Sequence, residues 1–138
     1  MIQKKYNVIL VYDYKQENIL MCKRTKEPFK DYFCLVGGKI EDGEDGFDAA
    51  YRELEEETGI KKKDISLKNI VNWEYPLLGE YIQVYAGHLN KDVILIREVD
   101  ELCWINHNEN FFDTTKYAGQ GNIGHVIEHV KSRREELF

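Results

Sequence analysis

The sequence is poor in cysteine, in proline and in long apolar runs. Its 138 residues include three Cys and two Pro. The cysteines, Cys22, Cys34 and Cys103, are odd in number and far apart, which argues against a disulfide framework or a cysteine zinc site. No apolar run approaches the ~20 residues of a transmembrane helix, and Val8–Tyr12 is too short for the core of a signal peptide. We therefore expect a cytoplasmic protein with no membrane partner.

Basic residues are also in deficit. The chain has 19 Lys+Arg against 25 Asp+Glu, for a net charge of −6. Binding to a nucleic acid polymer or to an anionic membrane favours a basic surface, so we expect neither partner. A small substrate that carries its own metal counter-ions is compatible with this charge. The 43% of hydrophobic residues is enough for one core, and we expect a single domain over residues 1–138.

Short β-prone runs account for most of the chain. Asn7–Tyr12 and Asn18–Lys23 predict an antiparallel hairpin, and Tyr32–Val36 predicts a third strand. Further strands are expected at Ile65–Trp73, Tyr81–Leu89, Val93–Ile96 and Leu102–Ile105.

Two segments have the helical period instead. The first has a stripe of residues spaced for one buried face: Phe47, Ala50, Tyr51, Leu54 and Thr58. Asp45 is expected to cap this helix and Gly59 to end it. The second helix is expected from Asn122, a possible N-cap, to about Glu136. Helices among such strands predict an α/β sandwich with a mixed, largely antiparallel sheet.

The first helix carries an unneutralised acidic face. Glu53, Glu56 and Glu57 stand at i, i+3 and i+4. The one base within the helix, Arg52, is predicted to point away from them. Glutamates in a last helical turn oppose the macrodipole and repel one another, costs that a divalent cation would remove. Carboxylate oxygens suit Mg²⁺ or Mn²⁺, so the spacing favours a metal site over a solvated surface.

A glycine-punctuated loop, residues 37–44, precedes this helix and completes a motif. The pattern G-x5-E-x7-R-E-U-x-E-E-x-G-U, with U aliphatic, resembles the Nudix box of the Nudix hydrolases. All nine defined positions agree: Gly38, Glu44, Arg52, Glu53, Leu54, Glu56, Glu57, Gly59 and Ile60. One departure is Val36, where many members have proline. The resemblance implies a Nudix-type α/β/α sandwich that hydrolyses a nucleoside diphosphate linked to another group, with Mg²⁺ or Mn²⁺ as cofactor.

The resemblance also implies roles for individual residues. Glu53, Glu56 and Glu57 would be metal ligands, joined by the carbonyl of Gly38 or of Gly37. Glu53 is our candidate general base, and Glu98 would be an additional catalytic group, as ligand or base. Arg52 and Glu44 would form a structural pair that holds the loop against the helix.

Substrate choice is less determined. Arg24 and Lys39 are candidates to bind phosphates, and Asn122, in segment 118–122, is a candidate to bind a base. A small single domain resembles the MutT-type enzymes, which favours a nucleoside triphosphate or an oxidised purine such as 8-oxo-dGTP, cleaved to a nucleoside monophosphate and pyrophosphate. ADP-ribose or a dinucleoside polyphosphate is the alternative. The small-molecule nucleotide would be bound by a monomer or a homodimer.

Other classes remain open. His125, Glu128 and His129 match the H-x-x-E-H pattern of inverted zinc peptidases, but too little chain follows to supply a third ligand. A non-catalytic Nudix module that senses a nucleotide is a second alternative, although such modules usually have an eroded box. An isoprenoid diphosphate isomerase is a third, and its box typically departs from the pattern found here.

Overall fold

A sheet with helices on both faces makes up the fold. The computed structural model describes residues 4–27, 29–98, 100–118 and 121–138. The strands within these ranges are β1 (Lys4–Tyr12), β2 (Asn18–Lys23), β3 (Phe33–Cys34), β4 (Val36–Lys39), β5 (Lys68–Tyr75), β6 (Glu80–His88) and β7 (Glu101–Asn106). The helices are α1 (Gly46–Thr58), α2 (Asn122–Ser132) and α3 (Arg134–Leu137), with a 3-10 turn, η1, at Lys62–Asp64.

Strand β1 lies at the centre of the sheet. The strand order is β3-β2-β1-β6-β5, with β4 also paired to β1 and β7 to β2. The β1–β2 hairpin forms as expected, and the one parallel pair among these strands is β1 with β6. The expected mixed, largely antiparallel sheet is confirmed. Register places Asn7 of β1 opposite Gly38 of β4.

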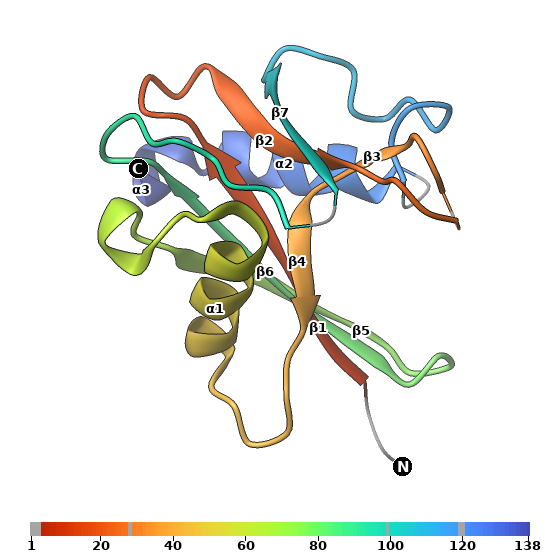
Figure 1. Cartoon of the computed structure of the whole chain (residues 1–138). Coiled ribbons are helices and arrows are strands. Elements are labelled where there is room, and N and C mark those ends of the chain that lie inside the picture. Colours follow the sequence, from red (N-terminus) through yellow and green to blue (C-terminus); the bar gives the residue numbers. More distant parts are fainter. Residues whose placement is uncertain (1–3, 28, 99, 119–120) are drawn as a thin grey trace.

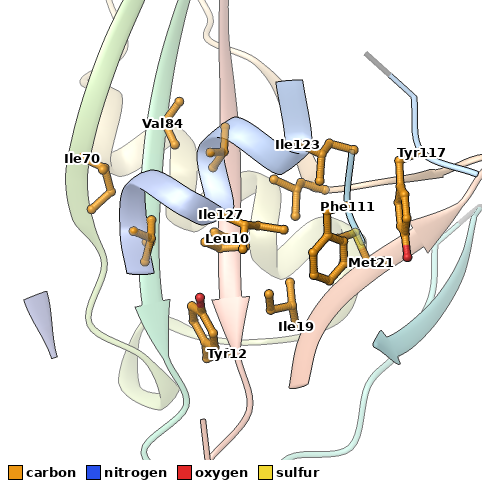
Figure 2. Packing of buried hydrophobic residues seen from close by; sticks show 14 of the residues in the cluster. Leu10, Tyr12, Ile19, Met21, Ile70, Val84, Phe111, Tyr117, Ile123 and Ile127 are labelled. Carbon is orange, nitrogen blue, oxygen red and sulfur yellow. The ribbon is translucent and has the colours of Figure 1, made fainter. Parts of the chain in front are cut away.

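The side chains of β1 alternate between two cores because successive residues of a strand point to opposite faces. Leu10 and Tyr12 pack with α2 and α3, whereas Ile9 and Val11 pack with α1. Figure 1 shows α1 on one face of the sheet and α2 on the other, and Figure 2 shows Ile123 and Ile127 of α2 close to Leu10. The α/β/α sandwich is confirmed.

Helix α1 begins and ends as its sequence predicts. The Asp45 carboxylate accepts hydrogen bonds from the N–H groups of Phe47 and Asp48, and Gly59 ends the helix at φ 78°. The expectation for Phe47 was wrong, because its side chain is 41% exposed and packs edge-on against Tyr85. Phe47 lies in the first turn, so it contacts the sheet only at its margin.

Two strand expectations were wrong. Tyr32–Val36 is not one strand: β3 pairs with β2, β4 pairs with β1, and Leu35 lies between them. Val93–Ile96 belongs to no strand. Its alternation is nevertheless real, since Val93 and Leu95 pack on the α1-side core while Ile94 and Ile96 are exposed.

The second helical segment is interrupted. Helix α2 ends at Ser132, and α3 follows after Arg133. Asn122 is the first residue of α2 and not its N-cap, a position taken by Gly121 at φ 91°. No helix in the described ranges combines the length and the apolar character needed to cross a membrane.

Candidate active site

The glycine pair of β4 contacts the acidic face of α1. The N–H of Gly37 donates to Glu57 Oε2 at 3.3 Å. A Cβ atom built on Gly38 would lie within 2.6 Å of both Glu53 carboxylate oxygens, so only glycine leaves room for that carboxylate. The structure therefore brings Glu53 and Glu57 against one short backbone segment.

Arg52 lies among the carboxylates. Its Nε and Nη2 donate to the two oxygens of Glu44 at 2.7 and 2.9 Å. Its Nη1 lies 3.1 Å from Glu53 Oε1 and 3.3 Å from Glu56 Oε2. The prediction that Arg52 points away was wrong, because the long side chain reaches the next helical turn as well as the loop. Nη2 also donates to the Lys39 carbonyl at 3.1 Å.

The electrostatics of the carboxylates differ. Burial raises the pKa of Glu57 to about 7; the negative charges of Glu53, Glu98 and Asp100 add to the rise, and the Gly37 N–H opposes it. Burial also raises the pKa of Glu53, against the effect of Arg52. By contrast, the hydrogen bond from Arg52 lowers the pKa of Glu44 to about 2. Glu57 is thus the carboxyl that most favours its neutral form, and Glu44 stays ionised.

A cavity of about 120 Å³ opens beside Glu57. Its lining consists of Cys22, Glu57, Glu98, Asp100 and Leu102. The structure thus brings Glu98 next to Glu57. We did not predict Asp100, which accepts hydrogen bonds from Thr25 N and Oγ1 at 3.2 and 3.3 Å. The sequence feature that could have identified Asp100 is its position two residues after Glu98.

A second cavity, of about 220 Å³, lies between the sheet and α2. It is mainly apolar and is lined by Val8, Cys34, Leu35, Trp73, Tyr75, Ile82, Ala118, Asn122, Ile123 and Val126. The segment from Cys34 to Gly38 separates this cavity from the carboxylates, since its first residues line the cavity and its last contact Glu53. Asn122 is therefore placed at an apolar cavity, on the other side of this segment from Glu53 and Glu57.

Lys39 and Arg24 are the other residues predicted to bind the substrate. Lys39 is exposed at the end of β4. Arg24 follows β2. The hydrogen bond with the Cys22 thiol lowers the pKa of Cys34, burial opposes that effect, and the charge of Arg24 adds to the lowering. Of segment 118–122, residues Gly119 and Gln120 lie outside the described ranges.

Neither histidine of the H-x-x-E-H match belongs to a metal cluster. Within the part of the chain that the structure describes, no three His, Cys, Asp or Glu side chains converge closely enough to hold an ion. The glutamates of α1 are included: Glu53 and Glu56 contact Arg52, and Glu57 accepts from the Gly37 N–H. Their oxygen donors still fit a hard cation such as Mg²⁺, and Glu57, partly buried and without an ion pair among the described residues, is the strongest sign of that fit.

Comparison with known proteins identifies the family. The NUDIX domain model matches residues 2–126. This protein belongs to the NUDIX family. The chain is 36% identical to an RNA pyrophosphohydrolase of Pelagibacter ubique over 90% of its length and 87% of that protein. It is 45% identical to an ADP-ribose pyrophosphatase of Methanocaldococcus jannaschii over 56 residues, which cover 41% of this chain and about a third (33%) of that relative.

Solved structures share the NUDIX fold at low identity. An Ap4A hydrolase of C. elegans superposes with a TM-score of 0.75 at 17% identity, covering 96% of this chain and 99% of the other. A MutT structure from work on Aliivibrio salmonicida and Vibrio cholerae gives 0.70 at 18% identity, covering 94% and 98%. The NUDIX domain of Shewanella oneidensis NrtR, solved with ADP ribose, gives 0.70 at 18%, covering 97% and 90%. At these identities the likeness concerns the fold alone.

Proposed function

We propose that this NUDIX protein is a Mg²⁺- or Mn²⁺-dependent pyrophosphohydrolase of a nucleoside diphosphate derivative. The observation that carries the proposal is the convergence of Glu53 and Glu57 on the Gly37–Gly38 segment, within a complete Nudix box. Glu53, Glu56 and Glu57 would hold the cation, with a glycine carbonyl beside them. When bound, such a cation neutralises diphosphate oxygens and lowers the pKa of an attacking water.

The chain's own residues would complete the chemistry. Glu53 is the proposed base that takes the proton of the attacking water, since its carboxylate lies at the glycine pair and its pKa is raised by burial. Glu98 faces the same acidic cavity as Glu57 and is the proposed additional ligand or base. Arg52 and Glu44 hold the loop against α1 in a structural role.

The apolar cavity is the proposed base-binding site. Trp73 and Tyr75 offer aromatic surface for stacking, and the Asn122 amide can pair with a base edge. Arg24 and Lys39 are proposed to bind phosphates. A nucleoside triphosphate, including an oxidised purine such as 8-oxo-dGTP, is the preferred substrate, and the products would be a nucleoside monophosphate and pyrophosphate.

The name of one relative supports ADP-ribose as an alternative to that substrate, and dinucleoside polyphosphates are the other alternative. The decisive experiment is hydrolysis of a panel of dNTPs, NTPs, 8-oxo-dGTP, ADP-ribose and Ap4A with Mg²⁺ or Mn²⁺, followed by chromatography of the products, because ADP-ribose and Ap4A would be cleaved without release of free phosphate or pyrophosphate. Preference for 8-oxo-dGTP or another triphosphate would support the MutT-type assignment. Absence of hydrolysis of every compound would instead favour the non-catalytic sensor.

A further inference from the structure

Asn7 is a buried polar residue with an unused donor. It is 2% exposed, in the strand at the centre of the sheet. Its Oδ1 accepts a hydrogen bond from the Gly38 N–H at 2.9 Å, whereas its Nδ2 has no partner among the described residues. An unpaired buried donor is costly, and a leucine of similar size would avoid that cost. The amide at this position therefore invites a functional explanation.

Two other buried polar residues, Thr58 and Asp64, have their side chains paired, whereas Tyr12 Oη and His107 Nδ1 are, like Asn7 Nδ2, buried with no partner among the described residues. The Thr58 hydroxyl donates to the Leu54 carbonyl at 2.6 Å, and Asp64 accepts from the Lys61 N–H at 2.9 Å. Both bonds lie within their own helix or turn. Asn7 instead contacts a residue that is distant in sequence and lies at the carboxylate site.

The position of Asn7 relates it to Glu53. In β1, Asn7 lies on the same face of the strand as Ile9 and Val11, two and four residues later. Because Ile9 and Val11 pack with α1, the Asn7 side chain also faces α1. Gly38 adjoins both the Asn7 amide and the Glu53 carboxylate. Its N–H donates to Asn7 Oδ1, and a Cβ built on it would meet the Glu53 carboxylate. The free amide donor is thus on the α1 side of the sheet, next to the glycine against which Glu53 packs.

The bond to Gly38 also orients a carbonyl. A trans peptide is planar, so the Gly37 C=O points away from the Gly38 N–H. By accepting that N–H, Asn7 directs the Gly37 carbonyl away from β1. A carboxylate has two oxygens, each with lone pairs of its own. One oxygen of Glu53 can therefore accept a hydrogen bond from an amide while the other binds a cation.

We propose that Asn7 is a positioning residue of the carboxylate site. Its Oδ1 holds the Gly37–Gly38 peptide, and its Nδ2 donates to Glu53 when that carboxylate exchanges Arg52 for a divalent cation. This role rests on the proposed function, since it requires Glu53 to be a cation ligand. Hydrogen bonds of this kind fix the orientation of a ligand and tune the affinity for the metal.

Two substitutions separate the two halves of the Asn7 amide. N7L removes both the acceptor and the donor at similar size, and N7D keeps an acceptor for Gly38 but has no donor when ionised. The matched control is Y12F, which removes the buried and unpartnered hydroxyl of Tyr12 from the same strand. Mn²⁺ affinity of the full chain is measured by electron paramagnetic resonance without nucleotide, and exchange of the Gly38 amide is measured by NMR without metal.

We expect N7L and N7D to bind Mn²⁺ about 10- to 100-fold more weakly than wild type, the range found for groups that orient metal ligands. Y12F should bind like wild type. The Gly38 amide should exchange slowly in wild type and N7D and quickly in N7L, with native chemical-shift dispersion in all. Equal or tighter Mn²⁺ binding by N7D would overturn the donor role, and unchanged Gly38 exchange in N7L would overturn the acceptor role.

The proposed function and the proposed role of Asn7 can be refuted separately. A wild-type protein that binds Mn²⁺ but hydrolyses no nucleotide would refute the hydrolase assignment and leave the role of Asn7 in place. A wild-type protein that binds no Mn²⁺ would refute both. Wild-type affinity in N7L would refute the positioning role alone.

Discussion

The Gly37 N–H donates to Glu57 Oε2 at 3.3 Å, which joins the glycine pair of β4 to the last turn of α1. The bond places a partly buried carboxylate beside a cavity that two further acids line. An isolated cluster of this charge is unfavourable, so the site is expected to respond measurably to changes in charge, pH and cation.

Glu57→Gln should abolish metal-dependent hydrolysis while leaving the fold intact. The amide has nearly the same shape but is a poor ligand for a hard cation. We expect kcat to fall by more than about 100-fold, beyond the range of groups that only orient ligands. Turnover is measured with the best compound of the nucleotide panel, and circular dichroism checks the fold. Turnover at the wild-type rate would refute the assignment of Glu57.

The same residue predicts how stability depends on pH in the absence of metal. The pKa of Glu57 is about 7 in the folded protein, above its ordinary value of 4.5, so the folded state binds the proton more tightly. The stabilisation that protonated Glu57 gives the folded state is therefore fully present below pH 4.5, and it is lost as the pH rises through 7. The loss is on the order of 3 kcal/mol at most, and solvent screening of this partly exposed group reduces it.

Thermal unfolding at pH 5 and pH 8, with a chelator present, tests this dependence. The wild type should lose more stability than Glu57→Gln between these two values, because the variant lacks the titrating group. Added Mg²⁺ should restore much of the loss in the wild type. Parallel pH profiles for the two proteins would show that Glu57 does not titrate in this window.

Gly38→Ala should reduce activity without a large change in stability. The new Cβ would occupy the place of the Glu53 carboxylate, whose side chain would have to move. We expect kcat/KM to fall about 10- to 100-fold. Gly43→Ala is the control: a Cβ there meets no atom within 4 Å, but the residue has φ +79°. This control should lose about 1 kcal/mol of stability and keep its activity.

Arg52→Lys tests whether the guanidinium geometry matters beyond its charge. Lysine cannot donate to both Glu44 oxygens and reach Glu53 at once. We expect loop residues 40–45 to become more sensitive to protease and kcat/KM to fall, with the loss partly offset at higher Mg²⁺ concentration. A variant with wild-type proteolysis and wild-type activity would show that a single positive charge is sufficient.

Val126→Phe should fill part of the apolar cavity. If this cavity binds the base, KM for nucleotides should rise about tenfold, because steric exclusion from an apolar pocket costs 1–3 kcal/mol. Inhibition by inorganic pyrophosphate should not change, since pyrophosphate has no base. An equal weakening of both ligands would indicate a general disturbance of the fold.

Local chemistry made part of this protein predictable. The caps of α1 and its acidic face depend on residues within one or two turns, so Asp45, Gly59 and the three glutamates could be identified directly from the sequence. The Nudix box added Glu44 and Arg52 as a pair. The direction of Arg52 could not be derived from helical spacing alone, because a flexible side chain chooses among several carboxylates.

Tertiary pairing accounts for what could not be predicted. The break at Leu35 arises because the chain changes its neighbour from β2 to β1, and no local signal encodes that change. Val93–Ile96 has the alternation of a strand without the partner. Asn7 was visible only as a residue of a predicted strand, since its contact with Gly38 depends on how β1 and β4 align.

The parallel pair of β1 and β6 has a consequence for the order of events during synthesis. Residues 4–12 leave the ribosome early, but their partner, residues 80–88, is made much later. The helix with the three glutamates is complete before the sheet that supports it, and contacts between distant segments form slowly. The nascent chain therefore contains Glu53, Glu56 and Glu57 before β6 exists to complete the sheet behind α1, and we expect the proposed cation affinity to appear only after β6 has emerged.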